Sequence, residues 1–177
     1  TEAEREKLVP MAEEVLEFAK FSIAFAKENL FPKYLDVIKS LGVIETGFLG
    51  TVSDDGALAL YDGTLRLMKA DGSYEEFAYD QYTDFISEKV LPWTYLKFPY
   101  AKNWGEGFSM DLSAPKGIYR TNTLARINVA DKMATPLAQI EFEEFRSKFG
   151  RPAQQTLLYN WARLIELPYN AELAVKF

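Results

Sequence analysis

The first third of the chain carries side chains, almost all apolar, at alternating spacings of three and four residues. They are Leu8, Met11, Val15, Phe18, Ser22 and Phe25. This spacing places side chains on one face of an α-helix, so it predicts one long helix from about residue 3 to about 29, with the stripe facing the core. Pro10 is expected to kink this helix or to mark its first turn. A short helix is expected over 32–40, started by Pro32 and stopped by Gly42.

Short alternating runs then replace the helical period. Three Asp-Gly pairs, at 55–56, 62–63 and 71–72, fall between these runs. Because Asp and Gly tolerate the positive φ of tight turns, such pairs are typical of hairpins. The pattern predicts an antiparallel meander over about 48–78, followed by a helix of about ten residues that Asp80 caps.

Two more helices are predicted in the last third. Thr135-Pro136 is a typical helix start, a capping hydroxyl followed by proline in the first turn, and Gly150 is expected to end that helix. Pro152 is expected to begin the last helix. Pro168 should break or kink it, since proline removes a helical hydrogen bond.

Between these parts, Pro and Gly punctuate residues 92–117, which are expected to be irregular, and 118–128 are expected to form a strand or an extended buried segment. The predicted fold class is α+β, with helices at both ends packed on a small antiparallel meander and an irregular, aromatic-rich middle. A single domain over 1–177 is predicted. Its expected parts are helical (about 1–42), meander (43–79), mixed irregular (80–133) and helical (134–177).

Composition narrows the function classes. The chain has 177 residues, 48% of them apolar and 15% aromatic, with a formal net charge of −6. A net negative charge without an obvious basic face argues against a nucleic-acid partner. No apolar run approaches the roughly 18 residues that a membrane span needs. The acidic start at Thr1-Glu2 does not resemble a secretory signal, so we expect a cytoplasmic protein.

Cysteine and histidine are both absent. The side chains therefore cannot supply thiolate or imidazole ligands for a zinc, iron–sulfur or nickel site. A Ser-His-Asp or Cys-His nucleophile system is excluded for the same reason. We predict no catalytic residue, no metal ligand and no cofactor bound by this chain itself.

Several segments resemble a known family. The main ones are Trp93–Tyr100 and Gly117–Arg126. Further segments that agree in order and spacing are Gly42–Ile44, Tyr61–Arg66, Thr156–Tyr159 and Trp161–Glu166. Together they cover about residues 40 to 167. They resemble the central segment of the large (alpha) subunit of nickel–iron hydrogenases, of the soluble, NAD-reducing or cofactor-coupled type.

The resemblance implies a parent reaction, the reversible oxidation of dihydrogen, with electrons passed to a partner subunit. The family's Cys-x-x-Cys motifs hold nickel and iron and lie outside such a segment, so the chain would be a scaffold without metal ligands, inactive alone. Departures from the family pattern are Ala130, Asn160 and Pro168. The alternative is a non-catalytic, engineered structural or protein-interaction module, for which self-association would cover apolar surface.

Three cations are the candidate site residues. The resemblance implies that Lys97, Arg120 and Arg126 lie near the metal-bearing core, where arginine clamps carboxylates or carbonyl groups. The alternative is that they pair with acids such as Asp111 and Asp131 and hold an irregular segment together.

An aromatic cluster is the second candidate. It consists of Trp93, Tyr95, Phe98, Tyr100 and Trp104. These side chains could line a groove for a ligand or a partner, or they could form core beneath a loop-rich segment.

Overall fold

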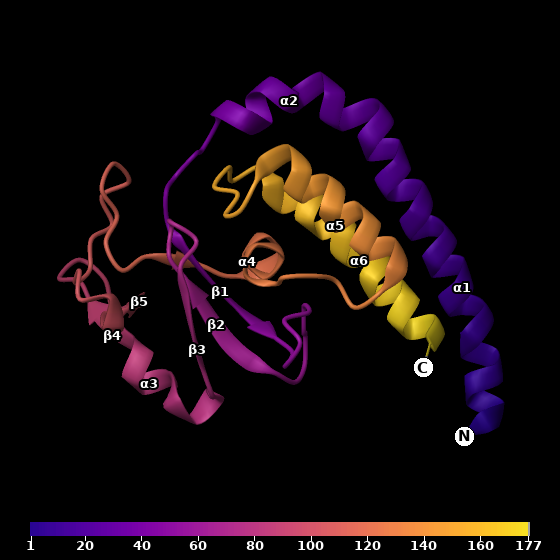
Figure 1. Ribbon diagram of the computed structural model, residues 1–177, viewed down its shortest axis with the longest axis horizontal. Coiled ribbons are helices and arrows are strands. Elements are labelled where there is room, and N and C mark those ends of the chain that lie inside the picture. The colour runs from indigo at the N-terminus through magenta and orange to yellow at the C-terminus, as the bar shows by residue number, and fades with distance from the viewer. Residues whose placement is uncertain (177) are drawn as a thin grey trace. The chain divides into compact units, whose positions relative to one another are not determined.

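The computed structural model describes residues 1–176 and contains two compact units (Figure 1). The helical unit comprises Thr1–Gly42, Lys132–Gly150 and Gln155–Phe177, and the sheet unit comprises Val43–Asp131 and Arg151–Gln154. Helices lie at both ends of the chain with strands between them, so the predicted α+β class is confirmed. That the chain is a single domain stays a prediction.

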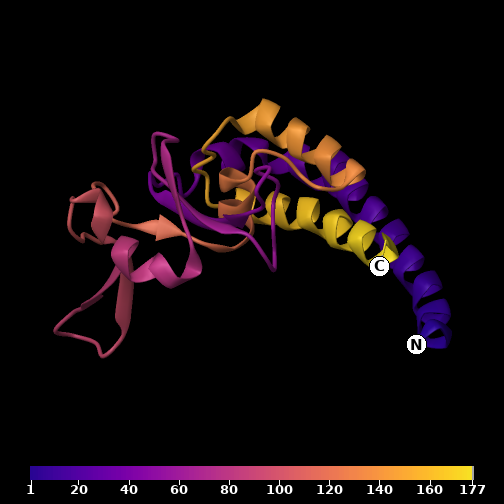
Figure 2. The ribbon, with the colours of Figure 1, turned by 60° about the horizontal axis from the view of Figure 1, so that its bottom comes forward.

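The helical unit contains four α-helices and one π-helical turn. They are α1 (Glu2–Phe25), the π-helical turn (Ala26–Leu30), α2 (Phe31–Ser40), α5 (Pro136–Phe149) and α6 (Leu158–Lys176). A capping box at Thr1 begins α1, since its side chain accepts from the Glu4 amide while the Glu4 carboxylate accepts from Thr1. Figures 1 and 2 show α5 and α6 side by side, and α1 also contacts α6.

The predicted inward stripe of α1 is wrong. Leu8, Met11 and Phe18 are 60%, 61% and 62% exposed, whereas Ala19 and Ile23 are buried. The buried side carries small residues, which let two helix backbones approach closely but contribute little to a hydrophobic period. The large side chains therefore dominated the sequence pattern although they flank the buried residues and stay exposed.

Three prolines behave differently from one another. Pro32 lies in the first turn of α2, as predicted. Pro10 lies inside α1, and Pro168 is buried inside α6, where the helix continues past it to Lys176. The predicted break at Pro168 does not occur, because tertiary packing compensates for one missing hydrogen bond. The last helix begins at Leu158 rather than at Pro152, whereas the predicted start of α5 at Thr135-Pro136 and its end at Gly150 are confirmed.

The sheet unit is built on a four-stranded sheet of order β3-β2-β1-β6. Its elements are β1 (Gly47–Val52), β2 (Thr64–Met68), β3 (Tyr74–Phe77), α3 (Tyr82–Phe85), β4 (Ile86–Val90), β5 (Lys97–Ala101), β6 (Tyr119–Arg120) and α4 (Asn122–Val129). Strands β1, β2 and β3 pair antiparallel, which confirms the predicted meander. The parallel strand β6 beside β1 was not predicted.

Helix α4 packs on β1 at a glycine. A Cβ added at Gly50 would lie 2.6 Å from Val129 Cγ2 and 3.4 Å from Arg126 Cα. Only glycine permits this approach of helix to strand. The prediction that 118–128 form a strand or extended segment is correct only for Tyr119 and Arg120, because a helix begins at Asn122.

The predicted ten-residue helix at Asp80 is wrong. It is reduced to a short 3₁₀ turn and the four-residue helix α3. Ile86–Val90 instead form β4, which pairs antiparallel with β5 inside the segment expected to be irregular. Phe85 stacks on Phe77 with ring centroids 4.1 Å apart, which anchors the end of α3 to the sheet.

Candidate functional site

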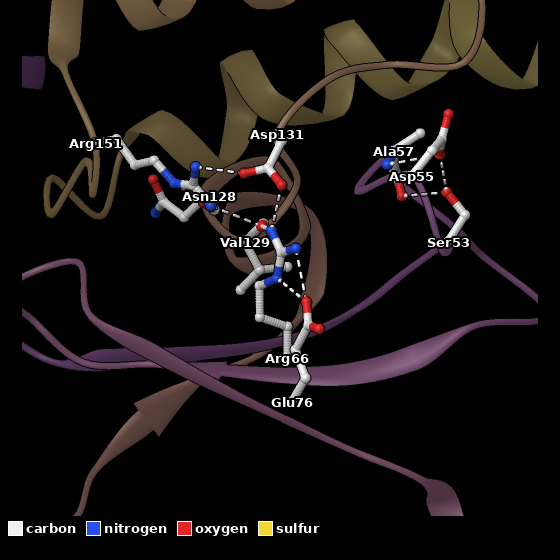
Figure 3. A network of polar contacts seen from close by, with 9 residues as sticks. All are labelled: Ser53, Asp55, Ala57, Arg66, Glu76, Asn128, Val129, Asp131 and Arg151. Atoms are coloured by element: carbon white, nitrogen blue, oxygen red, sulfur yellow. Dashed lines mark hydrogen bonds and ion pairs between the residues drawn. The ribbon is translucent and has the colours of Figure 1, made fainter.

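A buried polar site in the sheet unit is centred on Arg66, whose side chain is 4% exposed. Figure 3 shows its guanidinium between Glu76 and the end of α4. Its Nη1 donates to the Val129 carbonyl oxygen at 2.6 Å and to Asp131 Oδ2 at 2.9 Å, and its Nε donates to Glu76 Oε1 at 2.7 Å. The ring of Tyr74 covers the same guanidinium at 4.2 Å. A buried charge is thus paired on several sides.

A second guanidinium completes this site. Arg151 Nη1 donates to Asp131 Oδ1 at 2.6 Å, and Nη2 donates to the Val129 carbonyl oxygen at 2.9 Å. Its Nε donates to the Asn128 carbonyl oxygen at 2.9 Å. The two arginines, Asp131, Glu76 and the Val129 carbonyl are called the arginine clamp below. The clamp satisfies carbonyl groups at the end of a helix, which lack intrahelical partners.

The clamp also shifts the pKa values of Asp131 and Arg66. Burial alone would raise the pKa of Asp131, but hydrogen bonds from Arg151 and Arg66 outweigh it, so the pKa lies below its ordinary value. Burial alone would lower the pKa of Arg66, but hydrogen bonds to Asp131 and Glu76 raise it. Both groups therefore stay charged at neutral pH, and the clamp holds a permanent ion pair.

Arg120, one of the predicted residues, lies in a separate clamp. Its Nε donates to Thr46 Oγ1 at 2.7 Å, and its Nη2 donates to the carbonyl oxygens of Ile44 and of Gln154, the latter at 2.9 Å. Nη2 also donates to Gln154 Oε1 at 2.7 Å. Arg120 therefore binds backbone carbonyl groups, as predicted. Its other partners are the Thr46 hydroxyl and the Gln154 side-chain amide rather than a carboxylate.

The three predicted cations are not brought together. Lys97 is exposed on β5 and pairs with Glu88 of β4 at 2.6 Å, so its acid is neither of the two predicted. Arg126 lies on α4 over Gly50.

The two predicted acids have other partners. Asp131 pairs with Arg66 and Arg151, and the Asp111 carboxylate accepts from the Ser113 hydroxyl. The alternative named Lys97, Arg120 and Arg126 as the cations for these acids, whereas Arg66 and Arg151 hold Asp131.

The aromatic residues predicted to line a groove do not form one continuous cluster. Trp104 packs beside the sheet core, while Phe98 and Tyr100 contact Phe108. Trp93 lies 6.0 Å from Phe98 but is 70% exposed, and Tyr95 is 92% exposed. One part of the cluster is core, and the other part is exposed around the β4–β5 connection.

The two guanidinium groups of the arginine clamp hold their partners in place and release no proton at neutral pH. A hollow of about 470 Å³ lies beside it, lined by Asp54, Asp55, Glu76 and Asp131 as well as Arg66. Within residues 1–176, no group of three or more Asp or Glu side chains is placed to hold a metal ion.

Sequence reasoning missed Arg66 and Arg151. Arg66 lies within the run Thr64–Met68, where its apolar neighbours already signalled a buried strand. A charged residue in such a run requires a buried partner. Its partner Asp131 is 65 positions away, so no local spacing could have identified the pair.

No protein-family model matches the chain. It is 43% identical over 175 residues to the A-subunit of the vhu F420-non-reducing hydrogenase of Methanocaldococcus jannaschii, covering 98% of this chain and 40% of the relative. It is 45% identical over 170 residues to the A-subunit of the F420-non-reducing hydrogenase of Methanothermobacter thermautotrophicus, covering 94% and 34%. It is 40% identical over 124 residues to the NAD-reducing hydrogenase HoxS subunit beta of Cupriavidus necator, covering 69% and 24%.

A solved structure agrees with these relatives. The crystal structure of an NAD+-reducing NiFe-hydrogenase in the H2-reduced state matches with a TM-score of 0.85 and 33% identity, over 99% of this chain and 38% of that chain. The chain thus spans less than half the length of each of these proteins. None of the helices within residues 1–176 combines the length and apolar character that a bilayer crossing needs.

These relatives correct the predicted identification. They are the A-subunits of F420-non-reducing hydrogenases and the beta subunit of an NAD-reducing one. The prediction of a central segment of a nickel–iron large subunit of the NAD-reducing type is therefore wrong as stated, and the scaffold function deduced from it falls with it. The alternative, a non-catalytic engineered module, gains no support from these relatives either. The hydrogenase likeness itself holds: nearly the whole chain is similar to subunits of hydrogenases that work with partner subunits.

Proposed function

We propose that this chain is a part of the A-subunit of a hydrogenase of the F420-non-reducing kind. The observation that carries the proposal is the 43% identity to one such subunit over 98% of the chain. A likeness this continuous includes the segments of both units. The reaction of the whole protein would be the oxidation or formation of dihydrogen with an electron acceptor other than F420.

Within this part, the arginine clamp and the Arg120 clamp hold backbone segments in place. Each uses a guanidinium to join backbone segments distant in sequence, such as Ile44 and Gln154 around Arg120. Fixed positioning of this kind is what a redox site needs from its surroundings. Since the chain has no Cys or His, thiolate ligands for any metal centre would come from other polypeptide segments. We also propose a cytoplasmic location and an electron-transfer partner subunit, in keeping with the nucleotide acceptor in the name of one relative.

A graft tests the proposal. The matching stretch of the M. jannaschii A-subunit would be replaced by this chain, and the purified complex assayed for hydrogen-dependent reduction of a viologen dye. We expect the graft to assemble and to retain activity, whereas a matched deletion of the stretch should abolish both. The chain alone should reduce no dye. A graft that assembles with normal subunit stoichiometry and metal content, yet shows no activity, would contradict the proposed equivalence.

A further inference from the structure

The dipeptide Asp-Gly occurs at three places in the sheet unit, Asp55-Gly56, Asp62-Gly63 and Asp71-Gly72. An Asp-Gly pair can react with itself, because a five-membered ring closes when the glycine amide nitrogen attacks the aspartate carboxyl group. Glycine permits this attack best, since it has no Cβ beside the nitrogen. The reaction requires a carboxyl group and an amide that are both free to approach each other, and the three pairs differ in this respect.

The first pair is held by its own turn. The Asp55 Oδ1 accepts from the Ser53 hydroxyl at 2.7 Å and from the Ala57 amide at 3.2 Å, as Figure 3 shows. The Gly56 amide donates to the Ser53 carbonyl oxygen at 2.8 Å, and Gly56 is buried. The carboxylate and the amide of this pair are therefore both engaged with other groups.

The third pair is held in the same way. The Asp71 Oδ1 accepts from the Ser73 amide at 2.8 Å and from the Ser73 hydroxyl at 2.6 Å, and the Gly72 amide donates to the Lys69 carbonyl oxygen at 3.0 Å. The hydrogen bond from the Ser73 hydroxyl also lowers the pKa of Asp71. Ring closure expels the hydroxyl group of a protonated carboxyl, so a lowered pKa disfavours it.

The second pair, in the connection from β1 to β2, lacks these contacts. Asp62 is exposed, and among residues 1–176 no hydrogen bond joins its carboxylate or the Gly63 amide to another group. Gly63 cannot be exchanged for a less reactive residue, because its φ is +144° and a Cβ there would lie 2.2 Å from the Val52 carbonyl oxygen. The backbone therefore requires glycine directly after this aspartate.

We propose that Asp62 and Gly63 form a succinimide and then an isoaspartate in this chain, while the other two Asp-Gly pairs stay intact. The Gly63 nitrogen forms a bond to Asp62 Cγ, and the amide proton leaves with the carboxyl hydroxyl group as water. A second water opens the ring. Its attack at Cγ restores aspartate, whereas its attack at the main-chain carbonyl carbon breaks the bond from that carbon to nitrogen and leaves the chain linked through Cγ. No oxidant or cofactor takes part, and the reaction is independent of the proposed hydrogenase role.

The product changes the hairpin at one defined place. An isoaspartate adds one atom to the backbone just before β2, where Thr64 pairs with Val52 at the end of the β1–β2 ladder. The additional atom displaces Thr64 along the strand relative to Val52, so we expect this terminal pair to be weakened first.

Heavy-oxygen water measures the reaction, since each opening of the ring leaves one solvent oxygen atom in the peptide. The whole chain would be incubated in it at neutral pH and digested in ordinary water, and the mass of each Asp-Gly peptide determined. We expect Asp62 to be labelled at least about tenfold faster than Asp55 or Asp71, because these must first lose hydrogen bonds that together are worth about one such factor. Methylation by an isoaspartyl methyltransferase should mark the same peptide. Equal labelling of the three pairs, or no label at Asp62, would overturn the proposal.

Unfolding in urea supplies the control, because the protection of Asp55 and Asp71 belongs to the folded turns. All three pairs should then be labelled at similar rates, whereas a preference for Asp62 that persists in urea would overturn the role of the turn contacts. Asp62→Glu should remove the label at this position with unchanged circular dichroism, since a six-membered ring closes more slowly. Ser73→Ala, which takes one hydrogen bond from Asp71, should raise the labelling of Asp71 alone.

Discussion

On the buried side of α1 the helical unit uses small and branched apolar residues, Ala19 and Ile23, whereas the sheet unit places a charged residue, Arg66, in the middle of its sheet. Both positions are almost fully inaccessible to water. Apolar packing gains free energy from each buried methylene and depends little on direction. A buried guanidinium gains little net free energy but requires every partner in place.

This difference indicates which kind of substitution should destabilise each unit most. The helical unit should lose stability in proportion to the volume removed. The sheet unit should respond steeply to loss of one polar group, because the partners that remain are left without their hydrogen bonds. The following changes would break or sharpen this comparison.

Arg66→Met is expected to have the largest effect, a loss of about 4 kcal/mol in the free energy of unfolding of the sheet unit. It removes the donor to Val129 and leaves Glu76 and Asp131 without their shared cation. Urea unfolding combined with hydrogen exchange at β2 measures it. Lys89→Met, at an exposed cation on β4, serves as the control and should change stability by less than about 0.5 kcal/mol. A loss below about 1 kcal/mol for Arg66→Met would show that apolar packing alone holds the sheet unit.

Ile23→Ala should cost the helical unit about 3 kcal/mol, since it removes a buried branched side chain and leaves a cavity beside α6. Val37→Ala on α2, a 45% exposed position, is the matched control and should cost under about 0.5 kcal/mol. Hydrogen exchange of the α6 backbone amides measures this loss of stability. Equal effects of the two substitutions would mean that the buried side of α1 has been assigned to the wrong face.

Gly50→Val should destabilise the sheet unit by about 2 kcal/mol, because its side chain would overlap Val129 and move α4 from β1. Gly105→Asn is the control: nothing lies within 4 Å of that position, and asparagine tolerates its φ of 72°. Thermal unfolding of both variants makes the comparison. A Gly50→Val variant as stable as the unmodified chain would argue against close packing of α4 on β1.

Of these changes, lowering the pH should have the smallest effect on the stability of the sheet unit. The pKa of Asp131 in the folded chain lies below its unfolded value of about 3.9, so its ion pairs stabilise the sheet unit at neutral pH. That contribution is lost as the pH falls from near 4 through the folded pKa. In urea titrations at several pH values, Asp131→Asn should therefore be less stable at pH 7, with a difference that shrinks in acid. A difference independent of pH would exclude this linkage.

Sequence reasoning succeeded where local chemistry decides the structure. The Asp71-Gly72 pair does connect β2 to β3, and Thr135 with Pro136 does start α5. It failed where distant segments decide, as with the parallel pairing of β6 to β1 and the strand Ile86–Val90, which exists because β5 pairs with it. For the candidate site, Arg120 was identified, but Arg66 and Arg151 depend on residues far along the chain.

The π-helical turn Ala26–Leu30 has a consequence for how this chain can vary in length during evolution. Such a turn holds one residue more than an α-helical turn, so the helix that follows is rotated by about 100°. Deletion of one residue there should restore a regular α-helix while Tyr34 and Val37 keep their present side and the upstream stripe keeps its phase. A deletion between Leu8 and Phe18 would instead rotate the two parts of the apolar stripe onto different sides of the helix. Related chains that differ by one residue in this region are therefore expected to place the difference at the turn.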